Sequence, residues 1–369
     1  MRAAEPVGRS GTRPVLLYLY PRRSVFIDRD LDLLGPHFQV RTHELLRGPK
    51  WALPFRLLAQ LLFLVRNRAW RRTAICHFAG YHGLLPALWC RHLVIVLAGS
   101  DCASFPAMGY GNFRKALYGW ATSFSVRRAR RLLPVHHSLM GMEQDYDPDA
   151  PRNQGLKAFV PDLHTPFTEV PYGFDATYWS PDTGSRDPQL YLCVASGTRP
   201  DNNTHARKGV DLVLKVAPLL PDARFLIIGS PEPGAYEDLP PNVAVEGRQH
   251  AEALREHYRR ARYLLQVSVM EGFPNALCEG MLCGCIPIVS TMAAMPDIVG
   301  GTGALVTQRT AESLMEAILS LQALSEEELE DRSRSARERV AARWTPERRQ
   351  QELLAALSAV DAASPPARE

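Results

Sequence analysis

The sequence has no apolar run long enough to cross a lipid bilayer, which takes about 20 consecutive apolar residues. The best candidate, residues 57–65, is interrupted by Gln60 and preceded by Arg56. The N-terminal residues are polar and basic and lack the apolar segment of a secretory signal peptide. These absences argue against a membrane-spanning or secreted chain, and we expect a cytoplasmic protein.

Cysteine pairs are absent as well. The seven cysteines are scattered through apolar runs, and none forms a Cys-x-x-Cys pair. This pattern predicts reduced thiols in the core of a cytosolic protein. Cys283 and Cys285 flank a glycine, and we expect both to pack in the interior rather than to bind a metal ion. We find no internal repeat, and the low-complexity character is confined to a short tail from Ala362.

The length and charge of the chain suggest two domains with different partners. A chain of 369 residues has room for about two domains of ordinary size. Residues 1–150 carry 21 Lys and Arg against 10 Asp and Glu, whereas residues 151–369 carry 22 against 29. The basic first half is therefore expected to meet an anionic partner. A nucleic acid is a poor choice, because the arginines are dispersed and no nucleic-acid motif accompanies them.

The most informative stretch joins two apolar segments in the second half. Residues 263–267 are apolar and β-prone, and residues 286–289 are apolar again. Between them, residues 275–283 are typical of a short helix opened by Pro274 and closed by Gly284. A strand, loop, helix and strand in this order build a parallel sheet, so we predict an α/β fold.

Two glutamates and a helix start converge in this segment. Glu271 follows the first strand, where ligands bind in open parallel sheets. The helix directs the free N–H groups of Asn275 and Ala276 to the same place, which suits a diphosphate. Glu279 still reaches the rim, where a carboxylate can accept hydrogen bonds from ribose hydroxyls. The pattern predicts a nucleotide-sugar site, and the alternative is an ordinary helix with a solvated acidic face.

The segment Glu-Gly-Phe-Pro-Asn-Ala-Leu-Cys-Glu-Gly-Met, followed by Gly-Cys-Ile-Pro-Ile-Val-Ser, resembles the donor-site motif of the retaining glycosyltransferases of family four, the group 1 glycosyltransferases. The spacing of the glutamates is a weak signal alone, and Gly272, Phe273 and Pro274 make it specific. The resemblance implies that these three residues also bind the donor. It implies the GT-B fold as well, in which two Rossmann-like parallel-sheet domains face each other across a cleft.

A second match concerns the donor diphosphate. In the family a Lys-Gly that opens a helix follows an arginine, and both cations hold the diphosphate. Lys208 matches this lysine, while Arg199 and Arg207 are both candidates for the arginine because residues 201–205 resemble an insertion. Charge-assisted contacts of this kind stabilise a leaving group that gains negative charge.

The first half departs from the family pattern near the expected cleft. Family members often have His-Gly-x-Asp at a strand end, and here Gly99 and Asp101 match while Ala98 replaces the histidine. Asp101 is therefore kept as a candidate catalytic residue. His77 and His82 lie on neighbouring turns and are candidates for the missing histidine, although a lone histidine is more often a packed one.

Basic and apolar residues of the first half hint at the acceptor. The predicted helix at residues 51–70 has leucines at helical spacing and arginines at its far end, a composition typical of a helix in a membrane interface. Alternatively, it packs its leucines on the sheet. Arg22 and Arg23 follow the first strand, where they either bind an acceptor phosphate or form a solvated loop. These features predict an anionic membrane surface and a lipid-linked acceptor as partners.

Residues 168–181 resemble the inter-domain crossing of the family. We therefore expect an N-terminal acceptor domain at residues 1–172 and a C-terminal donor domain at residues 173–345, with a last helix at about 346–361 that returns to the first domain. Two Asp-x-Asp runs, at residues 28–32 and 145–149, lack convergent carboxylates or a calcium-loop pattern. We expect no metal ion and no cofactor, with a nucleoside-diphosphate sugar as co-substrate.

The sequence thus predicts a metal-independent, retaining glycosyltransferase of the hexosyltransferase type, which moves a sugar from a nucleotide sugar to a hydroxyl acceptor. The resemblance implies a role in bacterial-type surface polysaccharide or glycolipid synthesis, in the cytoplasm or on the inner face of the membrane. Glu271, Lys208, Arg199 and Asp101 are the expected catalytic residues. Two alternatives stay open: another GT-B enzyme, such as a sugar-nucleotide epimerase or a phosphorylase, and a non-catalytic protein that binds nucleotide sugars or anionic lipids.

Overall fold

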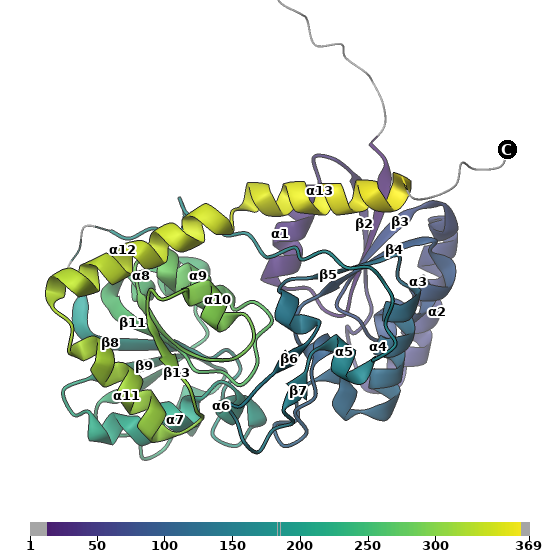
Figure 1. Cartoon of the computed structure of the whole chain (residues 1–369). Helices are drawn as coiled ribbons and strands as arrows, with labels where there is room; N and C mark the ends of the chain where they lie inside the picture. Colours follow the sequence, from purple (N-terminus) through teal and green to yellow (C-terminus); the bar gives the residue numbers. More distant parts are fainter. Residues whose placement is uncertain (1–12, 183, 185, 363–369) are drawn as a thin grey trace, which may run out of the picture.

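The computed structural model describes residues 13–182, 184 and 186–362. It contains two lobes, each built on a parallel sheet, which we call the front lobe and the rear lobe in chain order (Figure 1). The expectation of no signal peptide concerns the polar N-terminus, which falls in residues 1–12. Most of the short tail falls in residues 363–369. Both stretches lie outside the described residues.

The front sheet has the strand order β2-β1-β3-β4-β5 with parallel pairing throughout. Its central strands are near-continuous apolar runs, as expected for strands buried on both faces. Its strands are β1 (Val15–Tyr20), β2 (Gln39–Glu44), β3 (Thr73–His77), β4 (His92–Leu97) and β5 (Arg131–Pro134). Its helices are α1 (Val25–Leu34), α2 (Leu53–Arg66), α3 (Tyr81–Trp89), α4 (Ala116–Arg128) and α5 (Leu156–Phe159), and a small antiparallel pair is formed by β6 (Met142–Glu143) and β7 (Asn153–Gln154).

The rear sheet has the order β10-β9-β8-β11-β12-β13 and is also parallel. Its strands are β8 (Asp187–Val194), β9 (Arg224–Ser230), β10 (Val243–Gly247), β11 (Ala261–Gln266), β12 (Ile286–Ser290) and β13 (Ala304–Val306). Its helices are α6 (Asn203–Arg207), α7 (Val210–Val216), α8 (Ala251–Arg260), α9 (Asn275–Leu282), α10 (Met295–Val299) and α11 (Ala311–Gln322). The β11-α9-β12 unit confirms the strand, loop, helix and strand predicted from the sequence.

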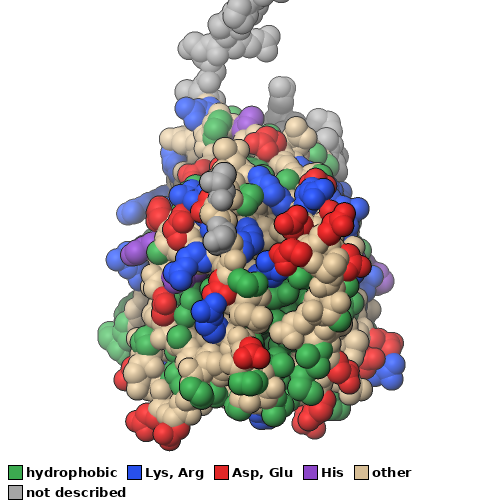
Figure 2. Space-filling model, turned by 90° about the vertical axis from the view of Figure 1, so that its left-hand side faces the viewer, with side chains coloured by type: hydrophobic (Ala, Val, Ile, Leu, Met, Phe, Trp, Pro, Cys, Tyr) green, Lys and Arg blue, Asp and Glu red, His purple; other side chains and the backbone are tan. Residues whose placement is uncertain are grey.

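Surface charge on the rear lobe is mixed. Figure 2, which views the molecule from the side of this lobe, shows acidic and basic side chains intermingled over the upper part of the face. Within the rear lobe, Arg262 donates to Glu326 through two guanidinium nitrogens. On this face of the rear lobe, therefore, the acidic side chains lie among basic ones, although residues 151–369 carry an excess of acids.

Two long helices close the chain. Helix α12 (Glu326–Arg343) lies on the rear lobe and begins with a capping box between Ser325 and Glu328. Helix α13 (Pro346–Ala362), yellow in Figure 1, crosses to the front lobe and lies against α1. The last helix therefore connects the two lobes a second time.

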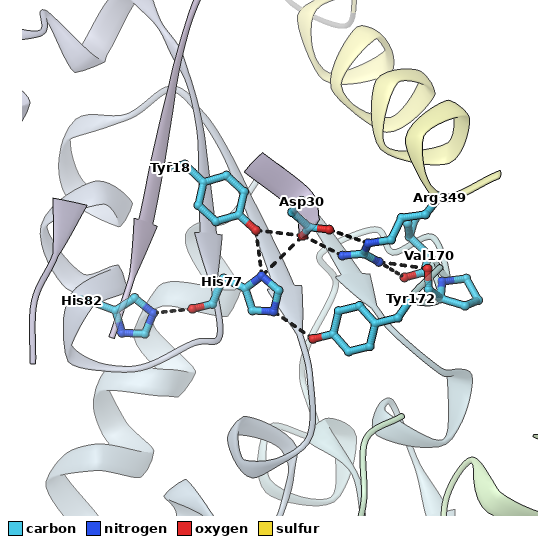
Figure 3. A network of polar contacts seen from close by, with 8 residues as sticks. Tyr18, Asp30, His77, His82, Val170, Tyr172 and Arg349 are labelled. Carbon is cyan, nitrogen blue, oxygen red and sulfur yellow. Dashed lines mark hydrogen bonds and ion pairs between the residues drawn. The ribbon is translucent and has the colours of Figure 1, made fainter. Parts of the chain in front are cut away.

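A buried ion pair fastens α13 to the front lobe (Figure 3). The Arg349 guanidinium donates to both carboxylate oxygens of Asp30, over 2.6 and 2.8 Å, and both side chains are buried. It also donates to the carbonyl oxygens of Val170 and Pro171 in the segment that joins the lobes. Burial alone would raise the pKa of Asp30, but Arg349 holds it well below its ordinary value. Asp30 is therefore ionised and fully paired.

His77 extends this network into the sheet, and His82 lies beside it. The Tyr18 hydroxyl donates to Asp30, His77 contacts the same hydroxyl through Nδ1 at 2.8 Å, and its Nε2 lies 2.9 Å from the Tyr172 hydroxyl. His82 contacts the carbonyl oxygen of His77. Burial lowers the pKa of both imidazoles, that of His82 to about 4, so they are neutral at pH 7. Both histidines occupy packed structural positions.

The cysteines lie in the core. All seven cysteines are free and buried, which confirms the prediction of core thiols. Cys285 contacts the carbonyl oxygen of Tyr258 through its sulfur atom, as a packed thiol does. None of the helices in the described part of the chain combines the length and the apolar character that a bilayer crossing needs.

The buried pair makes a stability prediction. We expect Arg349→Met to lower the free energy of unfolding by about 3–5 kcal/mol, because the change removes the cation that compensates the buried Asp30 carboxylate. Urea unfolding of the purified chain measures this loss. Arg348→Met is the matched control on the same helix, since Arg348 pairs with Glu352 at the surface and such pairs contribute about 0–1 kcal/mol. Equal losses in the two variants would contradict the assignment.

Candidate functional site

A cavity of about 510 Å³ lies between the lobes, at the carboxyl end of β11. Front-lobe residues of the β1-α1 turn and of α1 line one side, and rear-lobe residues line the other. Open parallel sheets bind ligands at this end of their strands. The structure brings eight of the predicted donor-site residues to the wall of this cavity: Lys208, Glu271, Gly272, Phe273, Pro274, Asn275, Ala276 and Glu279.

Glu271 lies between two cations on the rear-lobe wall. Its carboxylate accepts a hydrogen bond from the Lys208 ammonium group, and Nη1 of Arg207 lies 3.7 Å from the same oxygen. Arg207 also stacks on the ring of Tyr110, with its guanidinium carbon 4.6 Å from the ring centroid. Burial would raise the pKa of Glu271, but Lys208 and Arg207 keep it below its ordinary value. Glu271 is therefore a carboxylate in the free protein.

Glu279 pairs with the opposite lobe. Its carboxylate accepts a hydrogen bond from Nη2 of Arg29, on α1, over 2.8 Å. Burial raises the pKa of Glu279 above its usual value, and Arg29 opposes that shift. The other terminal nitrogen of Arg29 is buried without a hydrogen-bond partner among the described residues. The ion pair therefore spans the cavity and leaves one guanidinium donor available.

The start of α9 offers donors to the same space. The first N–H groups of a helix have no intrahelical acceptor, and α9 opens at Asn275 after Pro274 with no side-chain cap. The Oδ1 atom of Asn275 is buried and has no partner among the described residues. Phe273 is buried against Phe174, with ring centroids 6.2 Å apart, and against Trp344. The helix start is thus held rigidly, with polar atoms that a ligand could satisfy.

The lobes touch directly at Gly272. A Cβ atom built on Gly272 would overlap the carbonyl oxygen of Ala98, and one built on Gly99 would lie 3.1 Å from the nitrogen of Gly272. The backbone of Gly99 is also in the positive-φ region, at +136°, which favours glycine. Glycine at position 272 therefore permits this approach between the Glu271 loop and the end of β4, and a side chain there would not.

Two residues expected at the site lie elsewhere. The guanidinium group of Arg199 forms ion pairs with Asp201 and Glu232, and the nitrogen–oxygen distance is 3.1 Å in each pair. Asp101 is buried below the cavity, where its carboxylate accepts hydrogen bonds from the backbone N–H groups of Ala79, Ala98 and Gly99. Burial raises the pKa of Asp101 to about 6. Asp101 shapes the loop at the end of β4, and Arg207, not Arg199, is the arginine beside Glu271.

The sequence interpretation missed two front-lobe contributors, Arg29 and Tyr172. Both line the cavity. Arg29 lies between two aspartates, in the Asp-x-Asp run at residues 28–32. Its contact with Glu279 depends on the packing of α1 opposite α9, and no sequence spacing links residues 250 positions apart.

The rear lobe is similar in sequence to known proteins. The family model described as Glycosyl transferases group 1 matches residues 200–323, which contain Lys208, Glu271 and Glu279. This segment is therefore similar to the group 1 glycosyltransferases. The D-inositol 3-phosphate glycosyltransferase of Mycobacteroides abscessus is 30% identical over 125 residues, which are 30% of this chain and 28% of that enzyme. The sequence match to that enzyme thus spans well under half of either protein.

Similar solved structures cover both lobes. Sucrose-phosphate synthase from Thermosynechococcus elongatus has a TM-score of 0.70 at 15% identity, over 95% of this chain and all of that one. The Anabaena protein HepE, in complex with UDP and glucose, has a TM-score of 0.68 at 11% identity, over 94% of this chain and 100% of that one. The chain therefore has the GT-B fold, as the sequence resemblance implied.

The contact between the lobes can be tested at one glycine. We expect Gly272→Ala to lower the free energy of unfolding by about 1–3 kcal/mol, because the added methyl group overpacks the site against the Ala98 carbonyl. Thermal or urea unfolding measures the change. Gly234→Ala is the control, since nothing lies within 4 Å of a Cβ atom at Gly234. A neutral Gly272→Ala would show that the lobes do not make this contact in solution.

Proposed function

We propose that the chain transfers a sugar from a nucleoside-diphosphate sugar to a hydroxyl acceptor, with retention at the anomeric carbon and without a metal ion. The observation that supports this most directly is the cavity in which Lys208, Glu271, Glu279 and the start of α9 lie together. The group 1 glycosyltransferase segment contains all of them. HepE, which shares the fold, is described in complex with UDP and with UDP-glucose.

Leaving-group stabilisation is the first task of such a site. When the bond to the sugar breaks, the diphosphate gains negative charge. Lys208 and Arg207 are the nearest cations to Glu271, and the N–H groups at the start of α9 line the same cavity. We therefore assign the diphosphate to these groups, in place of the Glu271 carboxylate that Lys208 holds in the free protein. Positioned donors of this kind need no reorganisation during the reaction.

Glu271 and Glu279 then serve the two ends of the donor. Released from Lys208, the Glu271 carboxylate accepts hydrogen bonds from hydroxyls of the transferred sugar and orients its anomeric carbon toward the acceptor. Glu279 accepts from the ribose hydroxyls, for which the Arg29 contact must loosen. We do not assign Glu271 as a nucleophile: in a retaining enzyme of this family, the acceptor attacks the face that the diphosphate leaves.

A lipid-linked acceptor fits the surface of the front lobe. Helix α2 and Trp51, which lies just before it, expose an apolar stripe in which Trp51, Phe55 and Leu58 are 75, 68 and 55% exposed. Leu62 and Val65 continue the stripe, and arginines 66, 68 and 71 follow at the exposed end. An apolar stripe beside arginines is typical of helices that lie in an anionic membrane interface. We propose that this stripe holds the enzyme on such a membrane, at the inner face, where surface glycolipids or polysaccharides are built.

The donor site is tested by paired substitutions. We expect Glu271→Gln and Lys208→Met each to lower sugar transfer by about 100-fold or more, because each removes a contact that strengthens in the transition state. A panel of nucleoside diphosphates and their sugars, screened first by thermal shift, identifies the donor for the assay.

Two surface variants serve as controls for these substitutions. Glu316→Gln on α11 and Lys215→Met on α7 change exposed residues of the same types and should keep full activity. Full transfer by either site variant would contradict the assignment. A nucleotide that binds without transfer to any acceptor would instead favour a non-catalytic binding protein.

Membrane contact is tested with vesicles. We expect the purified chain to co-sediment with vesicles that contain phosphatidylglycerol, and less so as salt is added, because anionic lipids attract the arginines. The double variant Leu58→Glu, Leu62→Glu should lose most of this binding. Leu319→Glu, at an exposed leucine of α11 in the rear lobe, is the control. Equal binding by all three proteins would contradict a role for α2.

A further inference from the structure

Three side chains with metal-binding atoms meet at a second contact between the lobes. His136 and His137 follow β5 in the front lobe, and Asp297 lies on α10 in the rear lobe. Their ligand atoms all lie within 4.8 Å of one another. Within the described residues, this is the one such group of three. Neither Asp-x-Asp run of the sequence forms a comparable group.

The distances in this group suit a small coordination sphere. Oδ2 of Asp297 lies 3.1 Å from Nε2 of His136 and 3.6 Å from Nε2 of His137. A tetrahedral Zn²⁺ ion with bonds of about 2.0–2.1 Å separates its ligands by about 3.3 Å. Only small side-chain movements would therefore place an ion between these atoms.

Each histidine has a partner on its other ring nitrogen. Nδ1 of His136 lies 2.8 Å from the Ser138 hydroxyl oxygen, and Nδ1 of His137 lies 3.3 Å from a carboxylate oxygen of Glu169. Nδ1 of His137 can donate to Glu169, which leaves its Nε2 lone pair facing the centre of the group. Nδ1 of His136 accepts from the backbone N–H of Ser138 over 3.3 Å, so in the free protein its Nε2 carries the proton that faces Asp297. A metal ion at Nε2 would require that proton to move to Nδ1, where the Ser138 hydroxyl can accept it. Histidines that bind metals are usually oriented in this way by a carboxylate or a hydrogen-bond acceptor.

We propose that His136, His137 and Asp297 bind a divalent transition metal ion, Zn²⁺ in the first instance, which fastens the front lobe to the rear lobe. Two imidazoles and one carboxylate are ligands that Zn²⁺ accepts, with water in the fourth position. A cavity of about 230 Å³, lined by His137, Asp297 and Glu143 among others, leaves room for that water.

This ion would be separate from the proposed sugar transfer. The ring of His136 lies 6.5 Å from the ring of Phe273, and Phe273 forms part of the wall of the donor cavity. The metal therefore lies behind the wall, where it would stiffen the contact between the lobes rather than touch the diphosphate. The proposal does not depend on a nucleotide sugar being the donor.

Metal binding is tested on the whole chain after treatment with EDTA. We expect one equivalent of Co²⁺ to give the absorption spectrum of a tetrahedral site, and Zn²⁺ to displace it. Asp297→Ala and His137→Ala, both at exposed positions, should weaken Zn²⁺ binding at least about tenfold in calorimetry, and Glu169→Gln by a similar factor through the orientation of His137. His164→Ala, at an exposed histidine outside the group, should bind as the unaltered chain does.

Unfolding separates this proposal from an adventitious site. Zn²⁺ should raise the midpoint of thermal unfolding of the unaltered chain and of His164→Ala, because an ion that binds the folded state stabilises it by mass action. The rise should vanish in Asp297→Ala. Zn²⁺ binding of equal strength in all variants, or no binding by the unaltered chain, would overturn the proposal whether or not the protein transfers sugars.

Discussion

The buried ion pair between Asp30 and Arg349 holds the two-lobed architecture together. It joins residues 319 positions apart, one on the first helix and one on the last, and it also binds the carbonyl oxygens of the segment that joins the lobes. A buried charge is costly unless it is fully paired, so this contact constrains where α13 can lie. Because α1 carries both Asp30 and Arg29, the same helix that receives α13 also faces the donor cavity.

The cavity follows a simple electrostatic rule in the free protein. Each of its two acidic side chains is neutralised by a cation: Glu271 by Lys208 and Arg207, and Glu279 by Arg29. A nucleotide sugar carries both a diphosphate and hydroxyl groups, so it could take over the cations and the carboxylates together. Both carboxylates are thus paired with cations before a donor binds, and a donor would exchange partners rather than bring an unpaired charge into a low-dielectric space.

Contacts between the lobes occur on both sides of Phe273. On one side the neighbouring Gly272 lies against the carbonyl oxygen of Ala98, and on the other His136 faces Asp297. Phe273 itself packs on Phe174 and Trp344, which belong to the connections between the lobes. The Glu271 loop is therefore held by the front lobe as well as by its own sheet. A change in the angle between the lobes would therefore move residues that line the donor cavity.

From the sequence, the β11-α9-β12 unit and the grouping of Glu271 with Glu279 could be predicted, because strand and helix periodicity and the residues that begin and end helices are local properties. The sequence also shows the near-continuous apolar runs of β1, β3 and β4, which are local patterns of the same kind. It did not indicate the edge strands β2 and β5, which carry polar residues or a proline. Only the tertiary structure decided that Arg207 rather than Arg199 accompanies Glu271, that Asp101 supports a loop, and that Arg29, His136 and Asp297 reach across the lobes. These contacts depend on the packing of elements far apart in the chain, and no local pattern encodes them.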